Sequence, residues 1–150
     1  MGWRVSLKVP ACDFCEIVAG RTSAAIVLDD AHTLAFADLR QANPGHFLVI
    51  PKAHIPDVRE LDAEVGAALM QSVVRITRAV GVAFPNDGIS LWHSIGPSAF
   101  QEVPHLHIHV HPRLPDDGVL RVYPTLPASA DAATLHGYAE RLRAALAHAP

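Results

Sequence analysis

The clearest pattern in the chain is an apolar stripe at helical spacing between residues 58 and 82. Pro56 and Asp57 precede the stripe as start signals, and Pro85 follows it as a stop signal. Apolar side chains three or four positions apart fall on one face of an α-helix. We therefore predict a long amphipathic helix over 58–82 that buries Leu61, Val65, Leu69, Val73, Ile76 and Val80.

Shorter stretches have the apolar, β-rich composition of strands, and they are residues 24–30, 32–38, 46–52, 88–94 and 105–111. The acidic pair Asp29 and Asp30 breaks the first two stretches, which predicts a hairpin. The stretch LRQANPG after the second strand has the composition of a turn.

Two further helices are expected near the ends of the chain. A short one covers residues 11–20 and ends at Gly20. Another covers about 129–147, with a buried face expected of Leu135, Tyr138, Leu142 and Leu146. The order of elements predicts an α+β fold: about five antiparallel strands, one long helix and a C-terminal helix, in a single domain over 1–150.

Composition and charge limit the classes of partner that the protein is expected to bind. The chain has 150 residues and a formal net charge of −3 without a basic stripe, which argues against duplex nucleic acid. No apolar run approaches the roughly 20 residues of a membrane span, and the first residues lack a signal-peptide core. We therefore expect a cytoplasmic protein without a membrane partner.

The stretch HLHIHVH alternates histidine with apolar residues. On a strand, this alternation places His105, His107, His109 and His111 on one face, with the apolar residues on the other. Burying that many imidazoles without partners would be costly, so their face must meet water, a metal or a ligand.

Three interpretations of the histidine face remain open from the residues alone. The first is a solvated, histidine-rich surface, and the second is a metal site made by the strand. The third is covalent catalysis at phosphorus, because a neutral imidazole is a nucleophile that titrates near neutral pH.

The pair Cys12 and Cys15 is separated by two residues. This spacing suits a metal site or a redox pair better than a structural disulfide. Two thiolates supply half of a tetrahedral zinc site, so other segments would have to provide the remaining ligands.

Four segments, taken together, resemble the histidine triad (HIT) family of nucleotide hydrolases and transferases, in its zinc-bearing bacterial form. They are CDFCEI, AFADLRQANPGHFLVIPKAHI, GPSAFQEVP and HLHIHVHPR, and they occur in consistent order over about residues 11–113. The resemblance implies an enzyme that acts at the α-phosphate of nucleotide conjugates, with phosphoramidates and dinucleoside polyphosphates as substrates.

The resemblance also implies catalytic roles. His107 is the nucleophile and forms a nucleotidyl-histidine intermediate that water hydrolyses. His109 contacts the α-phosphate and assists the leaving group, and His46 orients the triad. Gln101 hydrogen-bonds phosphate oxygens.

Substrate-binding roles follow from the same resemblance. Asp38 accepts hydrogen bonds from the ribose, and Phe36 and Leu39 border the base pocket. Ser94 stands where many members have Asn or Gln against phosphate or ribose, so its shorter side chain weakens or alters this contact.

Other positions depart from the family pattern. Glu102 replaces a Ser or Thr of some members, and a carboxylate there would repel phosphate unless it is turned away. Phe100 stands where a Gly is common, and His111 takes a place that is usually apolar. These departures put the choice of substrate in doubt more than the chemistry at His107.

For the cysteine pair, the resemblance implies a structural zinc ion held by Cys12, Cys15, His54 and His105. The alternative is two reduced, metal-free cysteines in a small core helix. Relatives are commonly dimers, so a homodimer is expected. Two other function classes remain: a nucleotide- or zinc-binding module with little turnover, and a purely structural metal protein.

Overall fold

The computed structural model describes residues 11–148. The chain divides into two compact units, with the boundary between Val119 and Leu120. The first unit carries every predicted site residue, and the second carries the C-terminal helix. The single domain expected over 1–150 stays a prediction.

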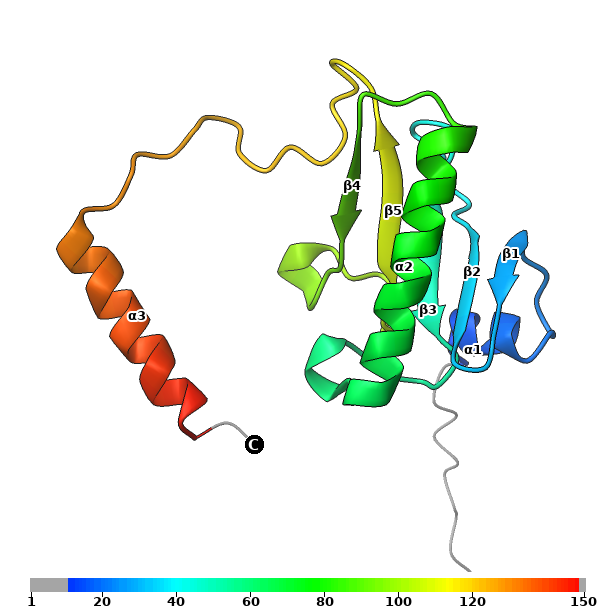
Figure 1. Cartoon of the computed structure of the whole chain (residues 1–150), viewed down its shortest axis with the longest axis horizontal. Helices are drawn as coiled ribbons and strands as arrows, with labels where there is room; N and C mark the ends of the chain where they lie inside the picture. The colour runs from blue at the N-terminus through cyan, green and yellow to red at the C-terminus, as the bar shows by residue number, and fades with distance from the viewer. Residues whose placement is uncertain (1–10, 149–150) are drawn as a thin grey trace, which may run out of the picture. The chain divides into compact units, whose positions relative to one another are not determined.

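The first unit is built on a five-stranded antiparallel sheet (Figure 1). This sheet confirms the α+β fold expected from the sequence. In chain order the strands are β1 (Ile26–Asp29), β2 (Thr33–Ala37), β3 (Phe47–Pro51), β4 (Gly88–Trp92) and β5 (Ile108–Arg113). Their order across the sheet is β1-β2-β3-β5-β4, so the histidine-rich strand lies between β3 and the edge strand β4.

The β1–β2 turn is stabilised by one carboxylate. Asp30 Oδ1 accepts hydrogen bonds from the backbone N–H of His32 and from both the N–H and the hydroxyl of Thr33. The buried Thr33 hydroxyl also lies 2.7 Å from Ser72 Oγ on the long helix. The acidic pair that marks this turn in the sequence therefore also ties the hairpin to its covering layer.

The long helix α2 (Ala63–Ala83) begins later than the predicted residue 58. Two carboxylates cap two separate elements: Asp57 accepts from the N–H of Arg59 at the short 3₁₀ turn η1 (Val58–Glu60), and Asp62 accepts from the N–H of Val65 at α2. A capping side chain satisfies helix N–H groups that lack an internal partner. Each cap therefore starts a new element and divides the predicted helix.

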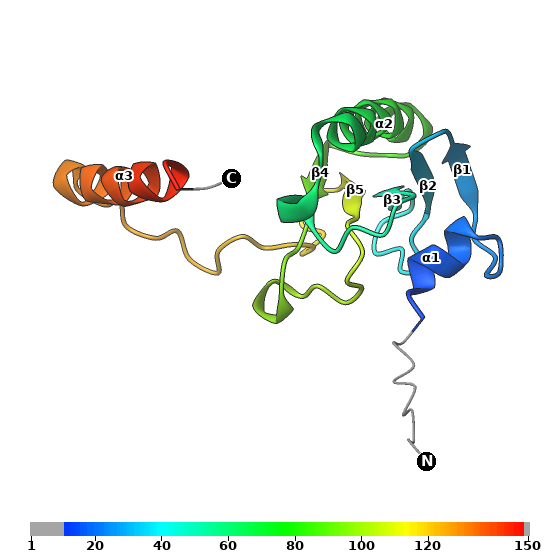
Figure 2. The same cartoon turned by 90° about the horizontal axis from the view of Figure 1, so that it is seen from below.

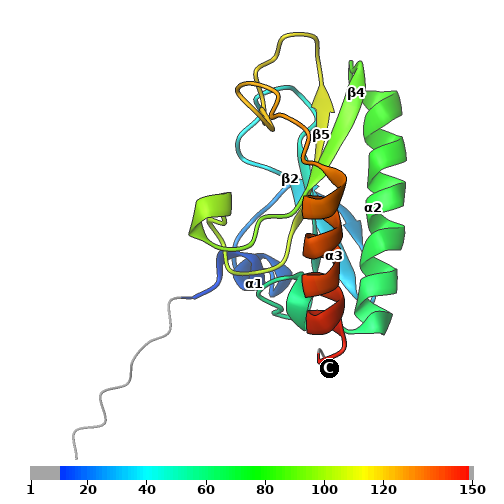
Figure 3. The ribbon, with the colours of Figure 1, turned by 90° about the vertical axis from the view of Figure 1, so that its left-hand side faces the viewer.

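Helices cover both faces of the sheet, as Figures 2 and 3 show. On one face α2 buries Leu69, Val73, Ile76 and Val80 against a cluster that includes Val49 and Val110. On the other face α1 (Asp13–Val18) inserts Phe14 among Leu34, Phe36, Leu48 and Ile50. The strands next to the site are thus packed on both sides, which limits their movement.

By length and composition alone, α2 is apolar enough to cross a membrane. The expectation that no segment reaches membrane length is therefore wrong on those two criteria. One face of the helix nevertheless packs on the sheet, as the core helix of a folded domain does.

The strand β5 begins at Ile108, so the expected strand over 105–111 starts three residues too early. The first pairs of β5 are Val49 with Ile108 and Trp92 with His109. β4 ends at Trp92, whereas β3 continues to Pro51 without pairing with residues 105–107. Both faces of the segment are covered: His105, His107 and His111 are at most 5% exposed, as is Leu106. The histidines face the protein interior, not an open surface.

The second unit contains the helix α3 (Ala132–Leu146), which begins where Asp131 caps the N–H of Thr134. Within the described residues of this unit, no other element buries its predicted apolar face. Each of the four side chains is more than half exposed, namely Leu135, Tyr138, Leu142 and Leu146.

Gly45 is a position where the fold requires glycine. Its φ of +106° is unfavourable for other residues, and a Cβ there would lie 2.5 Å from Cγ of Phe84 at the end of α2. We predict that Gly45→Ala lowers the free energy of unfolding by about 2–4 kcal/mol, combining backbone strain with overpacking. Urea denaturation measures this loss.

The matched control is Gly20→Ala. Gly20 also has a positive φ, of +71°, but a Cβ there would meet no atom of the described residues within 4 Å beyond its chain neighbours. Gly20→Ala therefore measures the backbone cost alone, and we expect it to lower the free energy of unfolding by about 1 kcal/mol. Equal losses for the two variants would contradict the close packing of Gly45 on Phe84.

Candidate active site and metal centre

The imidazole of His107 is held in one tautomer. Its Nδ1 lies 2.6 Å from the carbonyl oxygen of His105, and because a carbonyl only accepts, Nδ1 must carry the proton. The lone pair is then on Nε2, which no described residue hydrogen-bonds. Burial is the main cause that lowers the pKa of His107, which keeps the ring neutral. A neutral imidazole with a free Nε2 is a competent nucleophile.

A second pair of histidines lies beside it. His46 Nδ1 donates to the carbonyl of Arg40 at 3.0 Å, so its Nε2 accepts from His109 Nδ1 at 2.9 Å. The indole of Trp92 stacks on His109 with 4.3 Å between ring centroids and 7° between planes. These contacts fix the His109 ring and leave its Nε2 as an acceptor. The structure therefore brings His46, His107 and His109 together.

The pKa of His109 is lowered to about 3, chiefly by burial and then by neighbouring His107 and His46. Burial also lowers the pKa of His105 and His111. His111 donates from Nδ1 to the carbonyl of Pro112, and its buried Nε2 has no partner among the described residues. The four histidines of this segment, His105, His107, His109 and His111, are thus neutral imidazoles in a desolvated environment.

The loop before the histidines is closed by Gln101. The N–H of Gly96 donates to its Oε1 at 3.0 Å, and its Nε2 donates to the carbonyl of Pro56 at 3.1 Å. Both ends of the amide hold the loop in this state. The second N–H of Nε2 is bonded to no described residue, so the phosphate contact expected from the sequence needs no change of partner.

The predicted substrate-binding residues occupy different environments. Asp38 accepts from the N–H of Arg40 at 2.8 Å, and its other oxygen lies 3.7 Å from His46 Nε2. Phe36 is 3% exposed and belongs to the core beside Phe14, whereas Leu39 is fully exposed. Ser94 is half-buried on the segment after β4.

Glu102 forms an ion pair that the sequence does not reveal. Arg40 Nη1 lies 2.8 and 3.0 Å from its two carboxylate oxygens. The pair joins the loop after β2 to the loop before β5. The charge expected to repel phosphate is therefore partnered by a cation.

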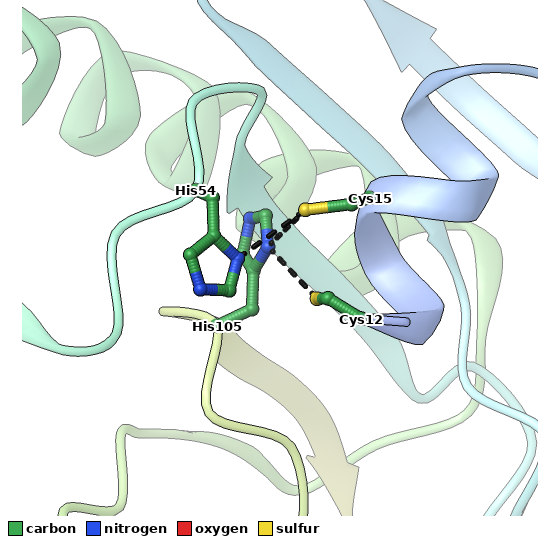
Figure 4. A group of neighbouring side chains, drawn as sticks. All are labelled: Cys12, Cys15, His54 and His105. Carbon is green, nitrogen blue, oxygen red and sulfur yellow. Dashed lines mark hydrogen bonds between the residues drawn. The ribbon is translucent and has the colours of Figure 1, made fainter. Parts of the chain in front are cut away.

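The second cluster joins Cys12, Cys15, His54 and His105 (Figure 4). His105 Nε2 donates to the carbonyl of Pro51, so its Nδ1 presents a lone pair to Cys12 Sγ at 3.4 Å and Cys15 Sγ at 3.6 Å. Nδ1 of His54 lies 3.2 Å from Cys15 Sγ.

These separations fit a tetrahedral metal. Bonds of about 2.3 Å to sulfur and 2.0–2.1 Å to nitrogen place the two kinds of ligand about 3.6 Å apart. Burial, followed by the neighbouring Cys12, raises the pKa of Cys15 to about 11, so the thiol stays protonated without a cation. The cluster can therefore hold a metal such as zinc, whose charge favours the thiolates.

Sequence patterns assign no role to His93, yet the structure places it against the backbone of His107, the predicted nucleophile. Its Nδ1 lies 3.2 Å from the carbonyl oxygen of His107, and its Nε2 accepts from the N–H of Val58 at 3.3 Å. A histidine after a strand carries no periodic signal, so only the tertiary fold identifies it.

Comparisons with known proteins agree on one family. A model described as "HIT domain" matches residues 19–116. The chain is 41% identical to the protein Hit of Bacillus subtilis over 102 residues, which are 68% of this chain and 70% of the relative. It is 33% identical to an adenosine 5'-monophosphoramidase of Schizosaccharomyces pombe over 120 residues, with 79% and 87% covered. A crystal structure of a HIT family protein from Bacillus subtilis superposes with a TM-score of 0.82 at 35% identity and covers 88% and 94% of the two chains.

The metal cluster predicts the effect of chelation. The purified chain should contain about one zinc ion, and removing it should lower the melting temperature, because the ligands join α1, the loop after β3 and the segment before β5. Cys15→Ser should lose the metal, whereas His32→Ala, at an exposed histidine outside the cluster, should retain it. A metal-free protein of unchanged stability would contradict the site.

The neutral histidines predict that stability falls with acid. The folded-state pKa of His109 is lowered, so this residue stabilises the fold fully above its ordinary value of 6.5 and loses that contribution as pH falls toward about 3. At pH 5.5 the loss is about 1 kcal/mol for such a group. Urea denaturation at pH 7.5 and 5.5 should show a smaller acid loss in His109→Asn. An unchanged acid loss in that variant would contradict the burial of a neutral His109, and His136→Asn on exposed α3 is the control.

Proposed function

The chain belongs to the HIT family, and from this premise we propose that it hydrolyses nucleotide conjugates at the α-phosphate through a covalent intermediate on His107. The observation that carries the proposal is the tautomer of His107. Its Nδ1–H is committed to the His105 carbonyl, so the lone pair is on Nε2.

The first step forms a bond between His107 Nε2 and phosphorus while the bond from phosphorus to the leaving group breaks. The leaving group departs with its electron pair and takes up a proton. In the second step water attacks the same phosphorus, the bond between phosphorus and His107 Nε2 breaks, His109 Nε2 takes up the proton that the water loses, and a nucleoside monophosphate is released. The imidazole returns to its starting form with Nδ1 still bonded to the His105 carbonyl.

His109 is the proposed source of the proton for the leaving group. The low pKa of about 3 makes it neutral in the free protein, with an acceptor at Nε2. The negative charge of the bound α-phosphate favours the protonated imidazole electrostatically and so opposes the effect of burial. His46 accepts from His109 Nδ1 and keeps the ring in position.

The binding of the nucleotide is assigned to the loops around this pair. Asp38 is proposed to accept hydrogen bonds from the ribose, and exposed Leu39 to contact the base with Phe36 behind it. Gln101 and Ser94 are proposed to contact the phosphate. The backbone N–H groups of the Gln101 loop supply further donors for the developing charge.

Among substrates, we favour phosphoramidates. The support is the similarity to a relative named as an adenosine 5'-monophosphoramidase. An amine leaving group carries no negative charge that the carboxylate of Asp38, beside His46, would repel. Dinucleoside polyphosphates are the second substrate class.

We assign zinc to the cysteine–histidine cluster as a structural ion. Four protein ligands complete a tetrahedron and leave no open position for water or substrate. When bound, the ion supplies cross-linking of three segments and not catalysis. A homodimer in the cytoplasm stays a prediction from the sequence.

A nucleotide-binding module with little turnover is the second candidate. The engagement of both ends of the Gln101 amide favours it, because this leaves fewer side-chain donors for a phosphate. It differs from the first candidate in one respect: it forms no covalent intermediate.

The test uses adenosine 5'-phosphoramidate labelled in the α-phosphate. The wild type should release AMP and, after an acid-free quench, carry label on His107. His107→Ala should lose at least about 10³-fold in kcat/KM, because the step has no alternative nucleophile. His136→Ala, on exposed α3, should remain active. Tight binding of AMP without label or product would favour the binding module.

A further inference from the structure

The backbone of His107 lies where the sheet ends. The last pair between β4 and β5 is Trp92 with His109, and β5 itself begins at Ile108. Among the described residues, no backbone N–H donates to the carbonyl of His107. The nucleophile is therefore not positioned by the strand ladder that holds its C-terminal neighbours.

His93 supplies the missing hydrogen bond. The N–H of Val58 can only donate, so the Nε2 that receives it is unprotonated and the proton is on Nδ1. That Nδ1–H faces the His107 carbonyl oxygen at 3.2 Å. Both nitrogens are used, and the neutral ring has one tautomer that satisfies both contacts.

The contacts of His93 join three segments that are far apart in sequence. The ring follows β4, its Nε2 contacts the first residue of η1, and its Nδ1 contacts the nucleophile's backbone. The two rings lie 6.4 Å apart at 79°, so His93 does not occupy the position of the attacking nitrogen. Its contact is with the main chain of His107 and not with the reacting atoms.

His107 is thus held at two points. Its side chain donates to the His105 carbonyl, and its own carbonyl accepts from His93. The first bond sets the tautomer and the second limits rotation of the peptide that carries the ring. A displacement of about 1 Å at a reacting group can cost 10²-fold in rate.

We infer that His93 is a positioning residue, which holds the backbone of His107 so that Nε2 points at the phosphorus. The inference rests on the proposed function, since it concerns the same nucleophile. It predicts an effect on the chemical step and not on nucleotide affinity.

The experiment compares three variants with adenosine 5'-phosphoramidate as substrate. His93→Phe keeps a ring and removes both hydrogen bonds, and it should lower kcat about 10–100-fold with KM and the Kd for AMP within about 2-fold. His93→Asn keeps an amide donor of similar reach and should recover part of the loss. His136→Phe, at an exposed histidine of α3, should behave as wild type.

The outcomes separate the two claims. A wild-type kcat in His93→Phe would overturn the positioning role and leave the proposed function intact. His93→Phe could instead lose melting temperature, AMP affinity and kcat in parallel, without recovery in His93→Asn. This result would show a merely structural role for His93 and would also overturn the positioning role.

A wild type without turnover or label on His107 would reject the proposed function. The placement of His107 by His93 is then still decided by ¹⁵N NMR of the imidazoles. The inference expects one Nδ1–H tautomer of His107 in the wild type and a mixture or broadened signals in His93→Phe. Identical spectra would overturn it.

Discussion

The hydrogen bond from His107 Nδ1 to the His105 carbonyl is the interaction on which the site depends. It fixes the proton on Nδ1, so it selects the nitrogen that carries the lone pair and sets the direction of that lone pair. Burial keeps the ring neutral: it lowers the pKa of His107 and outweighs the hydrogen bond to the His105 carbonyl, which acts in the opposite direction. The chemistry proposed at phosphorus needs each of these properties.

The rest of the fold holds the two residues of that bond in place. His105 is fixed from its side chain, through the Pro51 carbonyl on one nitrogen and the two thiols on the other. Packing by α1 and α2 holds β3 from opposite faces of the sheet, and α2 also packs on β5. A metal at the cysteine cluster would therefore stabilise the segment that supplies the nucleophile's hydrogen-bond acceptor, at a distance from the reacting atoms.

Local patterns in the sequence predicted the elements, while contacts between distant segments determined what the sequence could not show. The alternation in HLHIHVH placed the histidines together, but it could not show that β5 starts at Ile108 and that the N–H of Leu106 donates instead to the carbonyl of Ile55. The ion pair of Glu102 joins a partner 62 positions away. His93 gains its role from Val58 and His107, and no spacing rule connects these residues. The C-terminal stripe predicted α3 correctly but not its exposure, because helical periodicity does not specify a partner.

The most direct test of the account is a crystal structure of the protein with a non-hydrolysable AMP conjugate bound. The account predicts that His107 Nε2 lies about 3–3.5 Å from the α-phosphorus, in line with the bond to the leaving group. It also predicts that Nδ1 remains bonded to the His105 carbonyl. A nucleotide bound elsewhere, or a phosphorus that faces His109 or His111 with His107 turned away, would contradict the central claim.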